Sequence, residues 1–184
     1  MADKTRVRFY AAGIVAFSFS MPAIAFLFGM VLHENGHAIA CLLCGLPCSW
    51  SLTQVVYETS RNLLTNIVIG LAGGASQALF SFVFFWYTTH FEKRLLFKNI
   101  FEMQRSPKLS MVFGFEAAFL TVAFHGVVNG IWEGLFYQHY SQSYNNTVLT
   151  GALLLTSFML SLYVVFARFK RLTMSKSTQR TTIS

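Results

Sequence analysis

Two histidines, His33 and His37, stand on either side of a glutamate, Glu34, within a long apolar stretch of the sequence. On an α-helix, side chains four residues apart lie one above the other, so both imidazoles can reach one metal ion. In such a His-Glu-x-x-His arrangement two neutral imidazoles bind Zn²⁺, and the carboxylate accepts a proton from the activated water. An ionisable side chain inside a membrane span costs about 2.5–3.5 kcal/mol on insertion scales, so this cluster indicates a functional site. The alternative is a hydrogen-bonded polar pair, or a group of residues at the water interface.

A catalytic zinc ion needs a third protein ligand, and a later apolar stretch offers His125, Asn129 and Glu133. These residues are spaced by four and stack on one helix face, but His125 and Glu133 are about 12 Å apart along a straight helix. They therefore cannot both reach the same ion. If both apolar stretches leave the cytoplasm at their first residues, Glu133 reaches the depth of His33 and His37. We predict Glu133 as the third metal ligand, His125 as the second choice, and Asn129 as a residue that orients water or binds the substrate backbone.

Three cysteines, Cys41, Cys44 and Cys48, follow the histidine motif closely. Cys41 is four residues beyond His37 and shares its helix face, so its thiolate would give a His-His-Cys zinc site of different character. The alternative is that cysteine, as a small apolar-tolerant residue, suits close helix packing. An odd number of cysteines gives no disulfide framework and does not indicate the compartment.

The composition predicts the kind of scaffold that positions these residues. The chain has 184 residues, of which 54% are hydrophobic, 16% aromatic and 11% charged, whereas an ordinary globular domain carries about 25% charged residues. This composition excludes a disordered protein, a coiled coil and a cytosolic enzyme. We predict an all-α fold, a polytopic membrane helical bundle with about four transmembrane helices, in a single transmembrane domain over residues 1–172. The apolar stretches that are long enough to cross the bilayer cover residues 9–46, 66–87, 109–136 and 148–166.

The first apolar stretch is unusually long and exceeds one simple crossing. A long tilted helix, a helix kinked at Pro22, and a crossing followed by an interfacial segment all fit its length. Residues 1–25 also fit a signal peptide, with a basic start, an apolar middle and small residues at the end. Cleavage there would leave an apolar stub ahead of His33. The sequence does not choose between the three helical alternatives.

The basic residues predict the orientation of the bundle. All Lys and Arg residues except Arg61 lie in the amino-terminal tail, in the connection between the second and third apolar stretches, or in the carboxyl tail. The positive-inside rule therefore predicts an integral membrane protein with both termini in the cytoplasm, and the net charge of +7 needs no nucleic-acid partner. Residues 173–184 are rich in Ser and Thr, and we predict that they form a mobile, basic cytoplasmic tail.

Three segments resemble the site-2 protease family of intramembrane zinc metalloproteases, in its minimal membrane core. Residues 33–40 (HENGHAIA) are similar to that family's His-Glu-x-Gly-His segment, and residues 70–77 (GLAGGASQ) to its small-residue segment. Residues 129–134 (NGIWEG) resemble the segment that supplies the third metal ligand, with Glu in place of Asp and without the proline. The resemblance covers roughly residues 24–136. It implies that Gly73, Gly74 and Gln77 bind substrate together with Asn129, although the small residues also form a helix-packing face.

The expected function is that of an intramembrane zinc metalloprotease that cleaves a membrane protein or peptide inside the lipid bilayer. His33, His37 and Glu133 would hold Zn²⁺, and Glu34 would be the catalytic base. The alternative is a non-catalytic membrane subunit or assembly factor, which retains a metal-binding or polar core and binds partner membrane subunits. A third hypothesis is a transporter-like or channel element with His125, Asn129 and Glu133 along a polar path.

Overall fold

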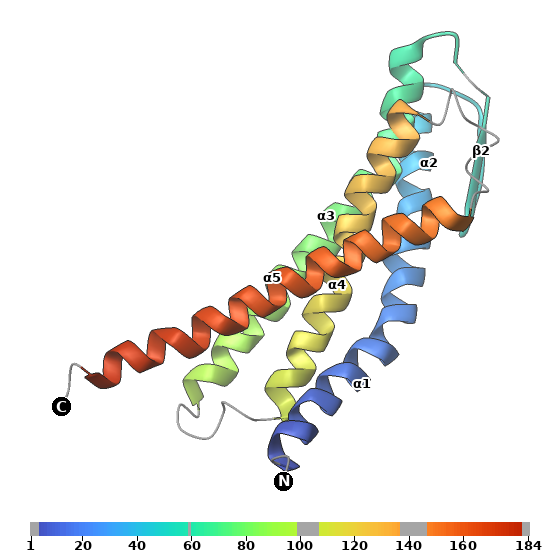
Figure 1. Ribbon diagram of the computed structural model, residues 1–184. Helices are drawn as coiled ribbons and strands as arrows, with labels where there is room; N and C mark the ends of the chain where they lie inside the picture. Colours follow the sequence, from blue (N-terminus) through green and yellow to red (C-terminus); the bar gives the residue numbers. More distant parts are fainter. Residues whose placement is uncertain (1–3, 59, 99–106, 137–146, 182–184) are drawn as a thin grey trace.

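The computed structural model describes residues 4–58, 60–98, 107–136 and 147–181. Over these residues the chain is helical, with one short antiparallel hairpin after the first helical stretch (Figure 1). In chain order the elements are α1 (Lys4–Phe26), a π-helical segment η1 (Leu27–Leu32), α2 (His33–Leu43), β1 (Cys48–Ser51), β2 (Gln54–Tyr57), α3 (Leu63–Lys98), α4 (Pro107–Leu135) and α5 (Thr147–Thr181).

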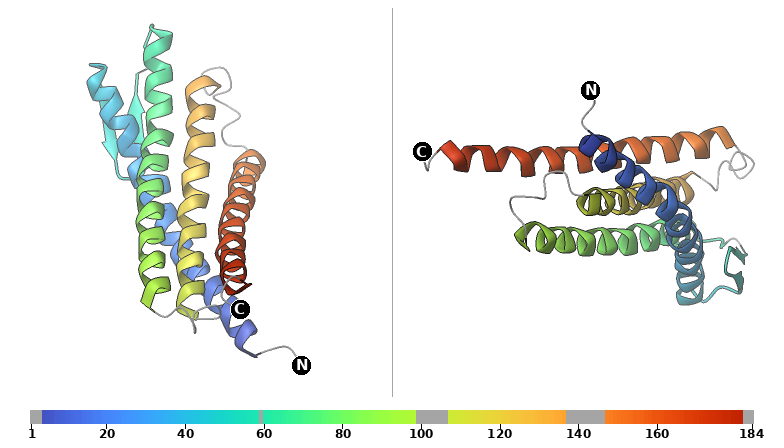
Figure 2. Two further views of the ribbon diagram at one scale, coloured as in Figure 1. Left: turned by 90° about the vertical axis from the view of Figure 1, so that its left-hand side faces the viewer. Right: turned by 90° about the horizontal axis from the view of Figure 1, so that it is seen from below.

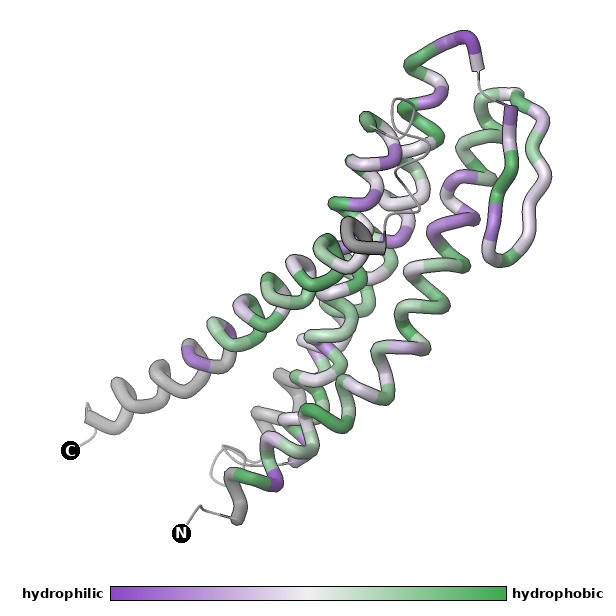
Figure 3. Tube along the Cα trace, turned by 45° about the vertical axis from the view of Figure 1, so that its right-hand side comes forward, coloured by the Kyte–Doolittle hydropathy of each residue, from purple (hydrophilic) through white to green (hydrophobic). Residues whose placement is uncertain are grey.

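Four helical stretches are long and apolar enough to cross a membrane, which confirms the predicted all-α bundle. Their bounds are Val7–Leu43, Leu63–Phe91, Pro107–Leu135 and Gly151–Arg168. Figure 3 shows apolar residues over the middle of the helices and hydrophilic residues gathered around α2, the hairpin and the neighbouring ends of α3 and α4. Residues 173–181 of the predicted tail belong to α5, and residues 182–184 lie outside the described part of the chain.

The first span is one bent helical stretch, since α1 passes directly into η1 and η1 into α2. Pro22 lies inside α1, and the change of direction in Figure 1 falls between α1 and α2. A π segment places more residues in a turn than an α-helix does, which shifts the helical register and bends the axis. Because of this shift in register, the face of α2 that carries the histidines does not continue the face of α1 that packs against α4.

Helix α4 is the centre of the bundle, because α1, α3 and α5 all pack on it. Figures 1 and 2 show that α1 begins and α5 ends at the same end of the bundle, where α3 ends and α4 begins. On α5, Arg168 Nη1 donates a 2.6 Å hydrogen bond to Oε2 of Glu116 on α4, whose side chain is fully buried. Two hydroxyls, Thr121 Oγ1 and Ser161 Oγ, meet at 2.8 Å in the same interface.

Small residues on α3 let the neighbouring helices approach closely. A Cβ on Gly70 would lie 2.8 Å from the carbonyl oxygen of Glu133, and a Cβ on Gly36 of α2 would lie 2.5 Å from Ser76 Oγ of α3. A Cβ on Gly74 would meet the Gly130 backbone. In lipid, helices associate without a hydrophobic driving force, and small residues at such crossings allow the close van der Waals packing that holds them together. The segment from Gly70 to Ser76 is therefore a packing face.

Gly74→Ala is expected to lower the free energy of unfolding by about 1–3 kcal/mol, because the added methyl group overpacks the contact with α4. The new Cβ would lie 2.5 Å from the backbone nitrogen of Gly130, which cannot rotate away. Gly151→Ala is the matched control, since nothing lies within 4 Å of a Cβ there. Unfolding in mixed micelles, followed by circular dichroism, measures both variants. Equal stability of the two would contradict the close α3–α4 contact.

Candidate metal centre

Three polar side chains meet where α2 faces the last turns of α4. His33 Nε2 and His37 Nε2 are 3.0 Å apart, and Glu133 Oε2 lies 3.0 Å from the first and 3.2 Å from the second. Bonds of about 2.0–2.1 Å in tetrahedral geometry separate ligand atoms by roughly 3.3 Å. The three donors therefore have the spacing of a metal site, and among the described residues they form a group that could hold a metal ion.

The two imidazoles are oriented by hydrogen bonds from their other ring nitrogens. His37 Nδ1 lies 2.7 Å from the carbonyl oxygen of Ile69, which can only accept a hydrogen bond, so Nδ1 carries the proton. His33 Nδ1 lies 3.0 Å from Gln77 Oε1. The Gln77 amide keeps Oε1 towards His33, because its Nε2 donates to the Val122 carbonyl oxygen at 2.9 Å. Both histidines are therefore assigned as Nδ1–H tautomers, which leaves both Nε2 lone pairs facing the centre.

The lone pairs of the two imidazoles and the negative charge of the carboxylate together favour binding of a cation. Two imidazole lone pairs and a carboxylate oxygen, all acceptors, lie within 3.2 Å of one another at buried or half-buried side chains. Buried acceptors at this spacing repel unless a metal ion or protons lie between them. The donor set of two imidazoles and one carboxylate thus fits a divalent metal in both distance and chemistry.

The carboxylate of Glu133 is positioned by its own helix. Asn129, one turn earlier on α4, donates from Nδ2 to Glu133 Oε1 at 3.0 Å, while Oε2 faces the imidazoles. On the opposite side, Gly73 of α3 provides the space for the His37 ring, because a Cβ there would collide with the imidazole. The contacts of Asn129 and Gly73 thus support the arrangement of the ligands.

The other two candidate ligands lie outside the group of three. His125 Nδ1 is 3.2 Å from Gln77 Nε2, two helical turns from Glu133 along α4. Cys41 Sγ lies 3.5 Å from the Leu46 carbonyl oxygen, and the side chain packs against Ala40 and Ile69. The structure thus groups the first-choice ligand, Glu133, with the histidine pair. The cysteine has the packing environment expected of a small buried residue.

Glu34, the predicted base, lies beside the ligand group and contacts the hairpin. Its Oε2 accepts a 2.9 Å hydrogen bond from the backbone N–H of Val55 in β2. In the hairpin Trp50 is opposite Val55, and the N–H of Val55 points out of the two-stranded sheet towards α2. This strand edge therefore fixes the position of one carboxylate oxygen of Glu34. The role of Glu34 as a proton acceptor stays a prediction.

Sequence reasoning missed two features of this site. The hairpin has a weak signal in Gln54-Val55-Val56-Tyr57, whose β-branched and aromatic residues favour a strand, but its turn at Leu52-Thr53 lacks Gly or Asn. Gln77 has no signal for its observed contacts, which bridge α2 and α4. Only 1% of its surface is exposed, and Gly73 and Gly74 are also buried. Their predicted substrate-binding role stays a prediction, as does that of Asn129.

Gln77→Leu is expected to weaken metal binding by about 10- to 100-fold, the usual effect of losing an outer hydrogen-bond partner of a ligand. The change frees His33 Nδ1 and lets the ring turn or change tautomer. In Gln77→Glu a carboxylate oxygen still accepts from His33 Nδ1, but the bond to the Val122 carbonyl oxygen is lost, so we expect an affinity between those of Gln77→Leu and the unaltered protein. Competition titration with a chelator measures both variants, and circular dichroism checks their folding. Unchanged affinity in a folded Gln77→Leu protein would remove Gln77 from this role.

Comparison of the chain with protein-family models, with curated proteins and with solved structures finds no match. What the structure defines is therefore a membrane protein of four apolar helices with a candidate metal centre between two of them.

Proposed function

We propose that the protein is an intramembrane zinc metalloprotease-like enzyme, which hydrolyses a membrane-embedded peptide segment with a metal-activated water. The observation that carries this proposal is the convergence of His33 Nε2, His37 Nε2 and Glu133 Oε2 at 3.0–3.2 Å. Such a group is costly inside apolar helices, which indicates a function beyond stability.

Zinc is the proposed metal because two histidines and one glutamate are a donor set of catalytic zinc sites. Structural zinc sites use four protein ligands, whereas three ligands leave one position for water. Asn129, Gln77 and the Ile69 carbonyl group each bond a ligand on the side away from the centre. The two acceptors, Gln77 and the Ile69 carbonyl group, raise the basicity of the imidazoles, and all three partners fix the orientation of the ligands.

A zinc ion held by His33, His37 and Glu133 would supply Lewis acidity and would make a bound water more acidic. Glu34 would accept a proton from this water as the water oxygen bonds to the carbonyl carbon of the substrate, and would donate that proton to the amine nitrogen as the C–N bond breaks. The Val55 N–H holds Oε2 of Glu34, so Oε1 is the oxygen that takes the proton. His33 and His37 keep their Nδ1 protons throughout, because Gln77 and the Ile69 carbonyl group accept from them.

The substrate class that we propose is a membrane protein or peptide whose helix unwinds so that its backbone can enter. We further propose that both termini face the cytoplasm, in line with the positive-inside rule. Exposed Arg8, Lys108 and Lys170 support this orientation, since they lie where α1 and α4 begin and towards the end of α5. Figure 1 shows the beginnings of α1 and α4 and the end of α5 at one end of the bundle, and α2 towards the other.

Metal analysis and a cleavage assay test the proposal together. We expect about one zinc ion per chain in the purified protein, measured by inductively coupled plasma mass spectrometry. In proteoliposomes that contain a panel of single-span peptides, we expect cleavage products that disappear with 1,10-phenanthroline and return with added zinc. A protein purified without stoichiometric metal, and unable to bind added zinc, would exclude the hydrolase.

The second candidate is a non-catalytic membrane subunit or assembly factor, and the hydrogen bond of Glu34 to Val55 favours it. A carboxylate that is bonded to the hairpin can tie β2 to α2 as a structural contact. His33, His37 and Glu133 would then share protons or bind a structural metal in a polar core. This second hypothesis predicts that partner subunits co-purify with the chain and that no peptide of the panel is cleaved, with or without zinc.

A further inference from the structure

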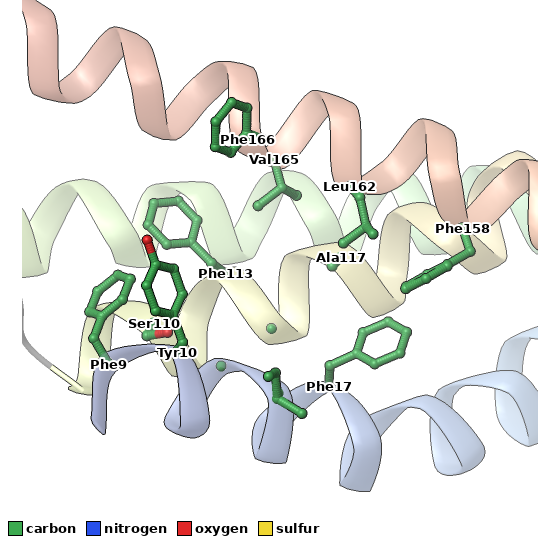
Figure 4. A pocket seen from close by; sticks show the side chains of 13 residues that line it. Phe9, Tyr10, Phe17, Ser110, Phe113, Ala117, Phe158, Leu162, Val165 and Phe166 are labelled. Carbon is green, nitrogen blue, oxygen red and sulfur yellow. The ribbon is translucent and has the colours of Figure 1, made fainter. Parts of the chain in front are cut away.

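A second feature of the molecule lies far from the metal centre, between α1, α4 and α5. It is an apolar groove of about 430 Å³. Figure 4 shows aromatic side chains of α1, including Phe9 and Phe17, on one side and side chains of α5, including Phe158 and Phe166, on the other. Helix α4 contributes the floor between them. The lining is apolar except for the hydroxyl groups of Tyr10 and Ser110.

The groove follows from how α1 and α5 pack on α4. Small residues bring α1 close, since a Cβ on Gly13 would lie 2.6 Å from Ser110 Oγ and one on Gly114 would lie 3.0 Å from Ala16 Cβ. Phe17 of α1 and Phe158 of α5 meet with ring centroids 5.2 Å apart and close one end. Beyond this contact the groove lies between the two outer helices, over Ser110, Phe113, Gly114 and Ala117 of α4.

The dimensions of the groove fit one lipid acyl chain. From Phe9 to Phe17 it extends about 12 Å along α1 at 1.5 Å per residue. This length is close to the roughly 15 Å of one leaflet, half of the hydrocarbon core. An apolar space of this kind is not filled favourably by water. Because the chain has four apolar helices of spanning length, the hydrocarbon chains of the bilayer can occupy the groove.

Two basic residues are close in the sequence to residues that line the groove, at the end away from the contact of Phe17 with Phe158. Arg8 directly precedes the lining residue Phe9 on α1, and Lys108 comes two residues before the lining residue Ser110 on α4. Both side chains are exposed. Basic residues beside the membrane surface attract anionic headgroups by about 1 kcal/mol each, which corresponds to roughly fivefold in affinity. We propose that the groove binds an anionic phospholipid, with one acyl chain between α1 and α5 and the phosphate at Arg8 and Lys108.

This lipid site is independent of the proposed hydrolase. Ser110 and Glu133 lie on the same helix, α4, about 35 Å apart at 1.5 Å per residue. A peptide bond at the metal centre therefore cannot occupy the groove. The lipid proposal rests only on the shape, the lining and the flanking charges of the groove, so its test uses no cleavage assay.

The headgroup preference is tested by native mass spectrometry of the purified full-length protein with equal amounts of phosphatidylglycerol and phosphatidylcholine. We expect one retained phospholipid per chain, with phosphatidylglycerol preferred. Arg8→Gln should lower this preference about fivefold, the effect of one basic residue. Arg61→Gln is the matched control, because Arg61 is exposed and precedes α3, distant from the groove along the chain. Equal retention of the two lipids by the unaltered protein, or equal effects of the two variants, would overturn the proposal.

A second pair of variants tests the groove itself. Leu162 of α5 lines the groove, and Leu162→Trp should fill it and abolish retention of the lipid. Leu79→Trp makes the same change on an exposed position of α3 and should leave retention unchanged. Circular dichroism confirms that both variants are folded. Retention of the lipid in folded Leu162→Trp would place it elsewhere, and a lipid-free dimer of the unaltered protein would assign the groove to a second copy of the chain.

Discussion

Glu34→Gln is expected to lower the rate of peptide cleavage by about 10²- to 10⁴-fold while the protein keeps its metal, the range typical of a general acid–base group. The amide has the shape of the carboxylate but cannot accept a proton from water. Its carbonyl oxygen can still accept the hydrogen bond from Val55 N–H, so the hairpin contact survives. The three metal donors are unchanged, which separates chemistry from metal binding. Cleavage of a fluorogenic membrane peptide and zinc content are measured on the same preparation.

The matched control is Glu58→Gln, the same chemical change at an exposed residue directly after β2. We expect this variant to cleave at the rate of the unaltered protein. If Glu34→Gln also cleaves at that rate, Glu34 is not the base. If Glu34→Gln loses both cleavage and metal, Glu34 acts on the metal site instead, and the proposed division of roles is wrong.

Glu133→Gln is expected to lower the metal affinity by more than about 100-fold, since loss of an outer partner alone already costs 10- to 100-fold. The substitution removes the negative charge that faces both imidazoles at 3.0–3.2 Å. The side-chain oxygen that replaces Oε1 can still accept from Asn129, so the local packing is kept. Chelator competition at fixed pH gives the affinity.

The comparison variant is His125→Ala, which removes the other candidate ligand. In the structure His125 Nδ1 is bonded to Gln77 Nε2 rather than to the histidine pair, so we expect a much smaller change in metal affinity. The reverse result, a strong loss in His125→Ala and little change in Glu133→Gln, would assign the third ligand to His125.

The parts of the fold that sequence predicts are those that depend on one chain segment at a time. The thickness of a bilayer sets the length of an apolar span, so the four spans are found within a few residues from hydropathy alone. The structure also places Glu133, and not His125, next to the histidine pair, as the constant rise per residue along a helix predicts, while the role of Glu133 as a metal ligand stays a prediction. The expected depth in the membrane therefore orders the candidate ligands on α4 by how close they lie to the histidines, without any knowledge of their contacts.

The missing parts depend on contacts between segments. No residue of Leu27–Leu32 indicates a π segment, because its wider turn is an adjustment between α1 and α2. Gln77 bridges the imidazole of His33 and the Val122 carbonyl group, a pairing across three helices that no local pattern encodes. The hydrogen bond from Val55 to Glu34 likewise requires the hairpin to fold back on α2.

The histidine pair and its carboxylate partner belong to the first and the third apolar helix. During biosynthesis the histidines enter the membrane long before the ribosome has translated Glu133, so a complete donor set exists only after the third helix has been inserted. A metal ion that needs all three donors would therefore bind late in maturation, after the bundle has assembled. Because such an ion would bind only the assembled form, it would also stabilise that form over any partly inserted intermediate.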